Sequence, residues 1–168
     1  KKKSTPAKEP MIRREVWASV LLLLSLIAFL AFFGLEGWLL DGYNWLVGSL
    51  IGSGRPIMPF SLLAAGALLL YKRKGRARLR VGCIMLLPVF FGAIRHLLAE
   101  AAAYGPGLSG LGALAESGRA GLSGGLLSGG LAIGARWAIS QVGAVILFVL
   151  LFAVALALAV ALNPGAIR

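Results

Sequence analysis

The sequence predicts an all-α membrane protein with four transmembrane helices, both termini on the cytoplasmic side, and short interfacial or re-entrant helical elements on the outer side. Composition is the first observation: 59% of the 168 residues are hydrophobic and 14% are charged, against about 50% and about 25% in soluble domains. Long uncharged runs are the second. The third is a net charge of +11 whose basic residues cluster between those runs, as expected where charges avoid the hydrocarbon.

The first and last spans are the most regular. Residues 1–15 form a basic cytoplasmic tail, and the rest of the chain, 16–168, is the four-span domain. Residues 16–33 carry no charge, and at about 1.5 Å per residue they nearly cover a hydrocarbon core of about 30 Å. A signal peptide is the alternative, which the length of the run and the lack of a small-residue cleavage site disfavour. Residues 142–162 form the last span, ending at Asn163-Pro164-Gly165.

The middle of the chain predicts two further spans. Pro56 or Pro59 opens the second, since proline is tolerated in a first helical turn, and Pro88 predicts a kink in the third. The second span is residues 56–71 and the third is residues 81–98, with a cytoplasmic loop, 72–80, between them. The two outer segments are residues 34–55 and 99–141.

The distribution of basic residues predicts the orientation. Thirteen of the 17 Lys and Arg residues lie in the tail, in loop 72–80 or at Arg168, and Lys/Arg excess marks the cytoplasmic side. A DNA-binding loop is the alternative, although no aromatic residue interrupts the run to provide stacking. The basic residues of this loop, assigned to topology and lipid contact, are Lys72, Arg73, Lys74, Arg76, Arg78 and Arg80.

Small and aromatic residues mark the outer side. Five glycines repeat at a spacing of four, which in a helix gives a smooth face for close packing and oligomerisation; a flexible loop is the alternative. They are Gly121, Gly125, Gly129, Gly130 and Gly134. Aromatic residues that settle at a membrane–water interface are Trp38, Tyr43, Trp45 and Trp137.

Residue types that carry chemistry are scarce. The chain has one Cys and one His, and it contains no paired acids, no nucleophile–base set and no Walker A motif. We therefore expect no catalytic, cofactor-binding or metal-binding residues in this segment. His96 is interpreted as an interfacial polar residue, with proton handling as the alternative.

Taken in order, these features resemble the N-terminal four-span domain of the FtsK/SpoIIIE family of bacterial DNA translocases. The resemblance rests on three features: the basic tail, the region of the second helix, and the glycine-rich stretch 124–156. In the second region, Trp45-Leu46-Val47-Gly48 leads through Arg55-Pro56-Ile57-Met58-Pro59 to a helix that closes at Tyr71-Lys72-Arg73-Lys74. The glycine-rich stretch resembles the family's Gly-Gly-x-x-x-Gly segment followed by a glycine-containing step, here Gln141-Val142-Gly143-Ala144.

The resemblance implies a non-catalytic anchor that oligomerises a DNA translocase in chromosome segregation, at the septum of the bacterial plasma membrane. It also implies that the native chain continues beyond Arg168 into a hexameric motor. ATP, Mg²⁺ and DNA would be bound only by that motor, and division-machinery proteins would contact the outer segments. The alternatives are a small transporter or channel subunit, motivated by Pro88, Arg95 and His96, and a self-contained membrane assembly protein.

Overall fold

The computed structural model describes residues 11–71, 77–99 and 108–160, and every regular element in those ranges is a helix. Four segments are long and apolar enough to cross a membrane: Arg14–Phe32, Trp38–Tyr71, Arg78–Leu98 and Gly125–Val160. The predicted all-α, four-span class is therefore confirmed. The elements are α1 (Met11–Phe32), α2 (Trp38–Ile51), the 3₁₀ helix η1 (Gly52–Ile57), α3 (Met58–Tyr71), α4 (Ala77–Leu98), α5 (Leu108–Arg119) and α6 (Gly125–Val160).

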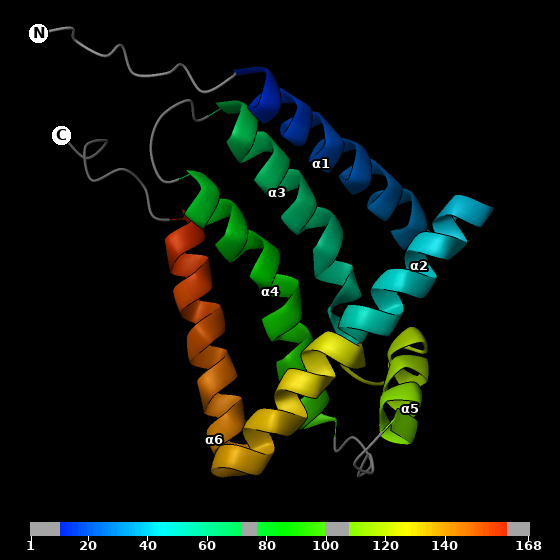
Figure 1. Ribbon diagram of the computed structural model, residues 1–168, viewed down its shortest axis with the longest axis vertical. Coiled ribbons are helices and arrows are strands. Elements are labelled where there is room, and N and C mark those ends of the chain that lie inside the picture. The colour runs from blue at the N-terminus through cyan, green and yellow to red at the C-terminus, as the bar shows by residue number, and fades with distance from the viewer. Residues whose placement is uncertain (1–10, 72–76, 100–107, 161–168) are drawn as a thin grey trace, which may run out of the picture.

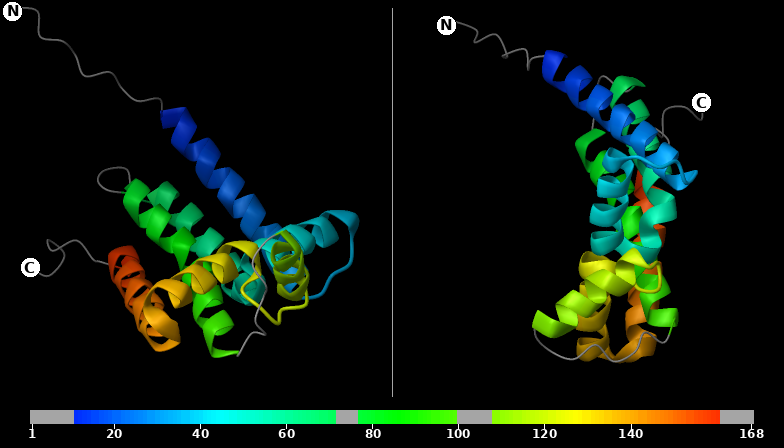
Figure 2. Two further views of the ribbon diagram at one scale, coloured as in Figure 1. Left: turned by 60° about the horizontal axis from the view of Figure 1, so that its bottom comes forward. Right: turned by 90° about the vertical axis from the view of Figure 1, so that its right-hand side faces the viewer.

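The helix ends sort onto two sides of the molecule. The N-terminal ends of α1 and α4 and the C-terminal ends of α3 and α6 lie together at the top of Figure 1. Helices α2 and α5 and the bend of α6 lie toward the opposite side, and a second view shows the same arrangement (Figure 2). The top side carries Arg14, Arg78 and Arg80 and is the side that the Lys/Arg excess of the full sequence predicts to be cytoplasmic.

Helix α1 packs along α3. It begins at Met11, inside the segment expected to be tail, and residues 1–10 lie outside the described residues. The Phe29 and Phe60 rings meet edge to face with centroids 5.2 Å apart. The buried Ser25 hydroxyl donates to the Pro59 carbonyl at 3.0 Å, which satisfies a polar group that would otherwise be costly inside a membrane.

The second span is a bent path rather than one straight helix. Helix α3 has 14 residues, which at about 1.5 Å each cover only about 21 Å of a core of about 30 Å. The six residues of η1 add about 12 Å at about 2 Å each. Helix α2 lies before this bend, in the segment 34–55 for which a helical element on the outer side was expected.

Helix α4 differs from its prediction at its N-terminal end. It begins at Ala77, so Arg78 and Arg80 lie in the helix and not in a loop; arginine favours helices, and nothing stops the helix from extending back beyond Val81. Pro88 lies inside α4, which is continuous across it. The other basic residues of the predicted loop, Lys72, Arg73, Lys74 and Arg76, lie outside the described residues.

Helix α6 is folded into a V. Its backbone leaves helical geometry at Ile139 and Ser140, and both figures show two limbs diverging from that bend (Figures 1 and 2). The second limb supplies 20 residues up to Val160, about 30 Å of helix. Residues 161–168 are outside the described part of the chain.

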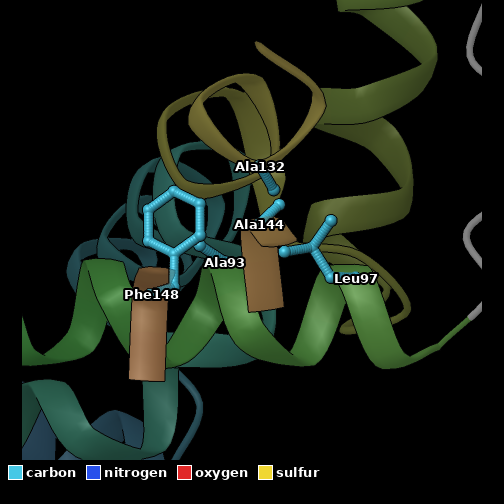
Figure 3. Close-up of a cluster of buried hydrophobic side chains, with 5 residues drawn as sticks. All are labelled: Ala93, Leu97, Ala132, Ala144 and Phe148. Carbon is cyan, nitrogen blue, oxygen red and sulfur yellow. The ribbon is translucent and has the colours of Figure 1, made fainter. Parts of the chain in front are cut away.

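The main hydrophobic core fills the inside of this V. Ala132 from the first limb and Ala144 and Phe148 from the second contact Ala93 and Leu97 of α4, and Figure 3 shows all five side chains together. The three alanines are 0% exposed, so both limbs approach α4 as closely as side-chain volume allows. Outside the V, large apolar side chains of α6 are exposed, including Val142 at 70% and Val154 at 55%, as expected of a surface that lipid covers.

Candidate functional site

The most tightly built region lies where five elements meet near the bend between α2 and η1. We call it the glycine junction, because at each of its glycines an added methyl group would approach the main chain or side chain of another element. Its glycines are Gly48, Gly52, Gly54, Gly92, Gly118, Gly124 and Gly125. They belong to α2, η1, α4, α5, the turn before α6 and the first residue of α6.

Backbones approach most closely at Gly52 and Gly125. A methyl group on Gly52 would collide with the Ser123 carbonyl oxygen and lie 2.6 Å from the Gly125 nitrogen. On Gly125, it would lie 2.7 Å from the Ser49 carbonyl oxygen. The end of α2 and the beginning of α6 therefore pack main chain against main chain, a contact that only glycine permits.

Hydrogen bonds fix this contact. The Ser53 N–H donates to the Ser123 carbonyl at 2.8 Å, and the fully buried Ser123 hydroxyl lies 2.7 Å from that of Ser117 and 3.2 Å from the Leu114 carbonyl. The Gly125 N–H donates to the same hydroxyl at 3.2 Å. Residue Ser123 thus satisfies polar groups of α5, α6 and η1 around one buried point, which rigidifies the junction.

His96 is part of the same junction. It is 3% exposed, and its Nδ1 accepts a hydrogen bond from the Gly124 N–H at 3.3 Å. The ring is buried between α4 and the turn before α6 and is not exposed as a surface polar residue would be; its depth relative to the membrane interface stays a prediction. The sequence does not predict this contact, because no spacing pattern links position 96 to position 124.

The predicted glycine face of 121–134 is not one surface. Gly121 has φ +74 and closes α5, because its N–H donates to the Gly118 carbonyl while Leu122 N–H donates to Ser117. This pattern is the Schellman cap, whose left-handed position favours glycine. Helix α6 begins only at Gly125, so Gly121 does not share a helical face with the others.

The remaining four glycines divide into two pairs. Gly125 packs against the main chain of α2, and a methyl group on Gly129 would lie 2.9 Å from the Leu114 side chain of α5. Gly130 and Gly134 have open space where a methyl group would be. The pair with open space, one helical turn apart, is therefore the part of the predicted face that remains available to another helix.

The four outer aromatic residues also differ in environment. Trp38 and Trp137 are 86% and 91% exposed, and Trp45 is partly covered by the Arg119 guanidinium, 4.9 Å from its ring centroid. Tyr43 instead packs against the buried cluster of Val47, Ile51 and Val89. Tyr43 is thus partly buried toward α4, and the placement of all four aromatic residues at a membrane–water interface stays a prediction.

Several junction glycines could not be predicted from the sequence. Gly48 and Gly52 share the spacing of four that occurs again from position 121, and the single glycines at 92 and 118 carry no signal. Within the described ranges, no three His, Cys, Asp or Glu side chains gather as a metal site would require. The arrangement holds helices together through close backbone contact.

Searches against family models, curated proteins and solved structures found no match to this chain.

Proposed function

We propose that this chain is a membrane-anchoring and oligomerising domain, and that it serves a DNA translocase of the FtsK/SpoIIIE type. One observation carries the anchoring and assembly part: a rigid helical bundle presents an open pair of glycines, Gly130 and Gly134, on the first limb of α6. The translocase part is supported by the resemblance of the sequence.

Rigidity matters because association in a membrane depends on shape. Lipid tails are as apolar as the helix surfaces, so helices associate through close packing rather than through a hydrophobic driving force. The limb that carries Gly130 is held at one end by the glycine junction and at the other by α4, where the Gln141 side chain donates to the Leu97 carbonyl at 3.0 Å. A surface held at both ends loses little conformational entropy when a second copy packs on it.

The distribution of helix ends agrees with such an anchor. The C-terminal end of α6 lies on the same side as the arginine-bearing ends of α1 and α4 (Figure 1), which the Lys/Arg rule makes cytoplasmic. A motor that follows this domain would then meet the chromosome in the cytoplasm. In this proposal the motor forms the hexamer, binds ATP, Mg²⁺ and DNA, and is positioned at the septum by division proteins that contact the outer elements.

The test compares oligomer size and cellular position for two double variants. Gly130→Leu with Gly134→Leu closes the open face, and Gly82→Leu with Gly112→Leu places the same side chains at glycines that are equally open on α4 and α5. We expect the first variant to reduce oligomer mass in light scattering and to lose septal enrichment of a fluorescent fusion. Unchanged mass and position would contradict the proposal, as would equal loss in the control.

A further inference from the structure

Two arginines converge on the outer side of the glycine junction. Arg55 comes from η1 and Arg119 is the last residue of α5. Both pass over Gly48 of α2, where a methyl group would lie 3.6 Å from Arg119 Cγ and 3.7 Å from Arg55 Cζ. Glycine at this position therefore provides the space in which the two cationic side chains lie.

Hydrogen bonds orient both guanidinium groups while leaving N–H donors unused. Arg55 Nη2 donates to the Arg119 carbonyl at 2.9 Å, and Arg119 Nε donates to the Ser49 hydroxyl at 2.8 Å. Ser49 in turn donates to the Trp45 carbonyl at 2.7 Å, and the Arg119 guanidinium lies over the Trp45 ring. Each guanidinium group is thus held through one of its nitrogens, and its remaining N–H groups can bind an oxyanion.

No carboxylate neutralises this pair among the residues that the structure describes. Asp41 and Glu116 belong to the same two helices, α2 and α5, yet neither forms an ion pair with Arg55 or Arg119. Two fixed positive charges without a carboxylate partner form a donor set that suits phosphate, which arginine binds through its planar fork.

The surroundings favour a lipid over a soluble anion. Trp45, which the Arg119 guanidinium covers, is 57% exposed, and the same helix also exposes Leu46 at 52% and Leu50 at 39%. A phospholipid offers acyl chains for these side chains and a phosphate for the arginines, whereas an acidic peptide would leave the leucines uncovered. Tryptophan and arginine together are typical of the headgroup level of a membrane.

We propose that Arg55 and Arg119 bind the phosphate of an anionic phospholipid headgroup on the outer side of the membrane. The site clamps η1, α2 and α5 together, and it does not depend on the translocase assignment. The lipid thereby completes the outer surface of the junction, at the end of the molecule opposite the cytoplasmic ends of α1 and α4.

The test titrates delipidated full-length chain in micelles with phosphatidylglycerol or phosphatidylcholine and measures bound lipid by native mass spectrometry. Arg55→Gln with Arg119→Gln should lose about tenfold in affinity for phosphatidylglycerol, as expected when charge-assisted hydrogen bonds are removed. The control, Arg95→Gln with Arg136→Gln, removes two exposed arginines from the same side and should retain wild-type affinity. Equal loss in both variants, or no loss in the first, would overturn the proposal.

Three further arms keep the outcome decisive. If the glutamine variant does not fold, Arg55→Lys with Arg119→Lys keeps both charges and loses the fork; we expect weaker phosphatidylglycerol binding, and unchanged binding would count against the site. Inorganic phosphate that displaced the lipid at millimolar concentration would show a free-anion site instead. Hexaglutamate that bound with the same dependence on Arg55 and Arg119 would identify a protein partner and reject the lipid.

Discussion

Residue Gly52 shows how far a single missing side chain determines this structure. Its φ is +54, and its α-carbon faces the main chain of residues 123–125. Any larger residue would both strain the local backbone and push η1 away from the start of α6. Because Ser53 bonds to Ser123 in the same place, that displacement would also break a backbone hydrogen bond between the two segments.

We therefore predict that Gly52→Ala destabilises the chain by about 3 kcal/mol, from overpacking and from the left-handed conformation. The matched control is Gly42→Ala on α2, where a methyl group meets nothing within 4 Å; it should stabilise by up to about 1 kcal/mol through helix propensity. The measurement is the free energy of unfolding by denaturing detergent in mixed micelles. Equal stabilities of the two variants would contradict the close contact at position 52.

Helix α6 is the element that the sequence describes least well. Its bend at Ile139 and Ser140 contains neither proline nor glycine, which are the residues that mark a break in a helix. The cause is tertiary: Ala132 and Ala144 must both reach α4, and Gln141 is bound to Leu97.

The bend places Ser140 at φ 73 and ψ 168, a conformation that is costly for any residue with a Cβ. Ser140→Gly should therefore stabilise the chain by about 1 kcal/mol. Ala138 lies two residues earlier, within the regular first limb of α6. Ala138→Gly should therefore destabilise the chain by about 1 kcal/mol through lower helix propensity. Thermal unfolding of both variants in the same micelles gives the comparison, and a shift of the same sign in both would exclude the strained bend.

For the whole molecule, composition and charge predicted more than glycine spacing did. The all-α class and the four apolar segments follow from long uncharged runs, which any membrane imposes. The glycine junction could not be predicted, because Gly48, Gly92 and Gly118 are brought together by tertiary packing and leave no periodic signal in the sequence. The same reason applies to Gly121: its spacing predicts a place on a helical face, but tertiary structure makes it the cap of α5.

Orientation is a property of the whole molecule, and single cysteines can measure it. On a Cys83→Ser background, Tyr71→Cys and Trp137→Cys replace side chains that are 88% and 91% exposed, at the C-terminal end of α3 and near the bend of α6. The Lys/Arg rule places position 71 in the cytoplasm and position 137 outside. A membrane-impermeant thiol reagent added to intact cells should label position 137 at once, and position 71 only after permeabilisation. Labelling of position 71 alone in intact cells would invert the topology, and with it the cytoplasmic side on which the proposed motor depends.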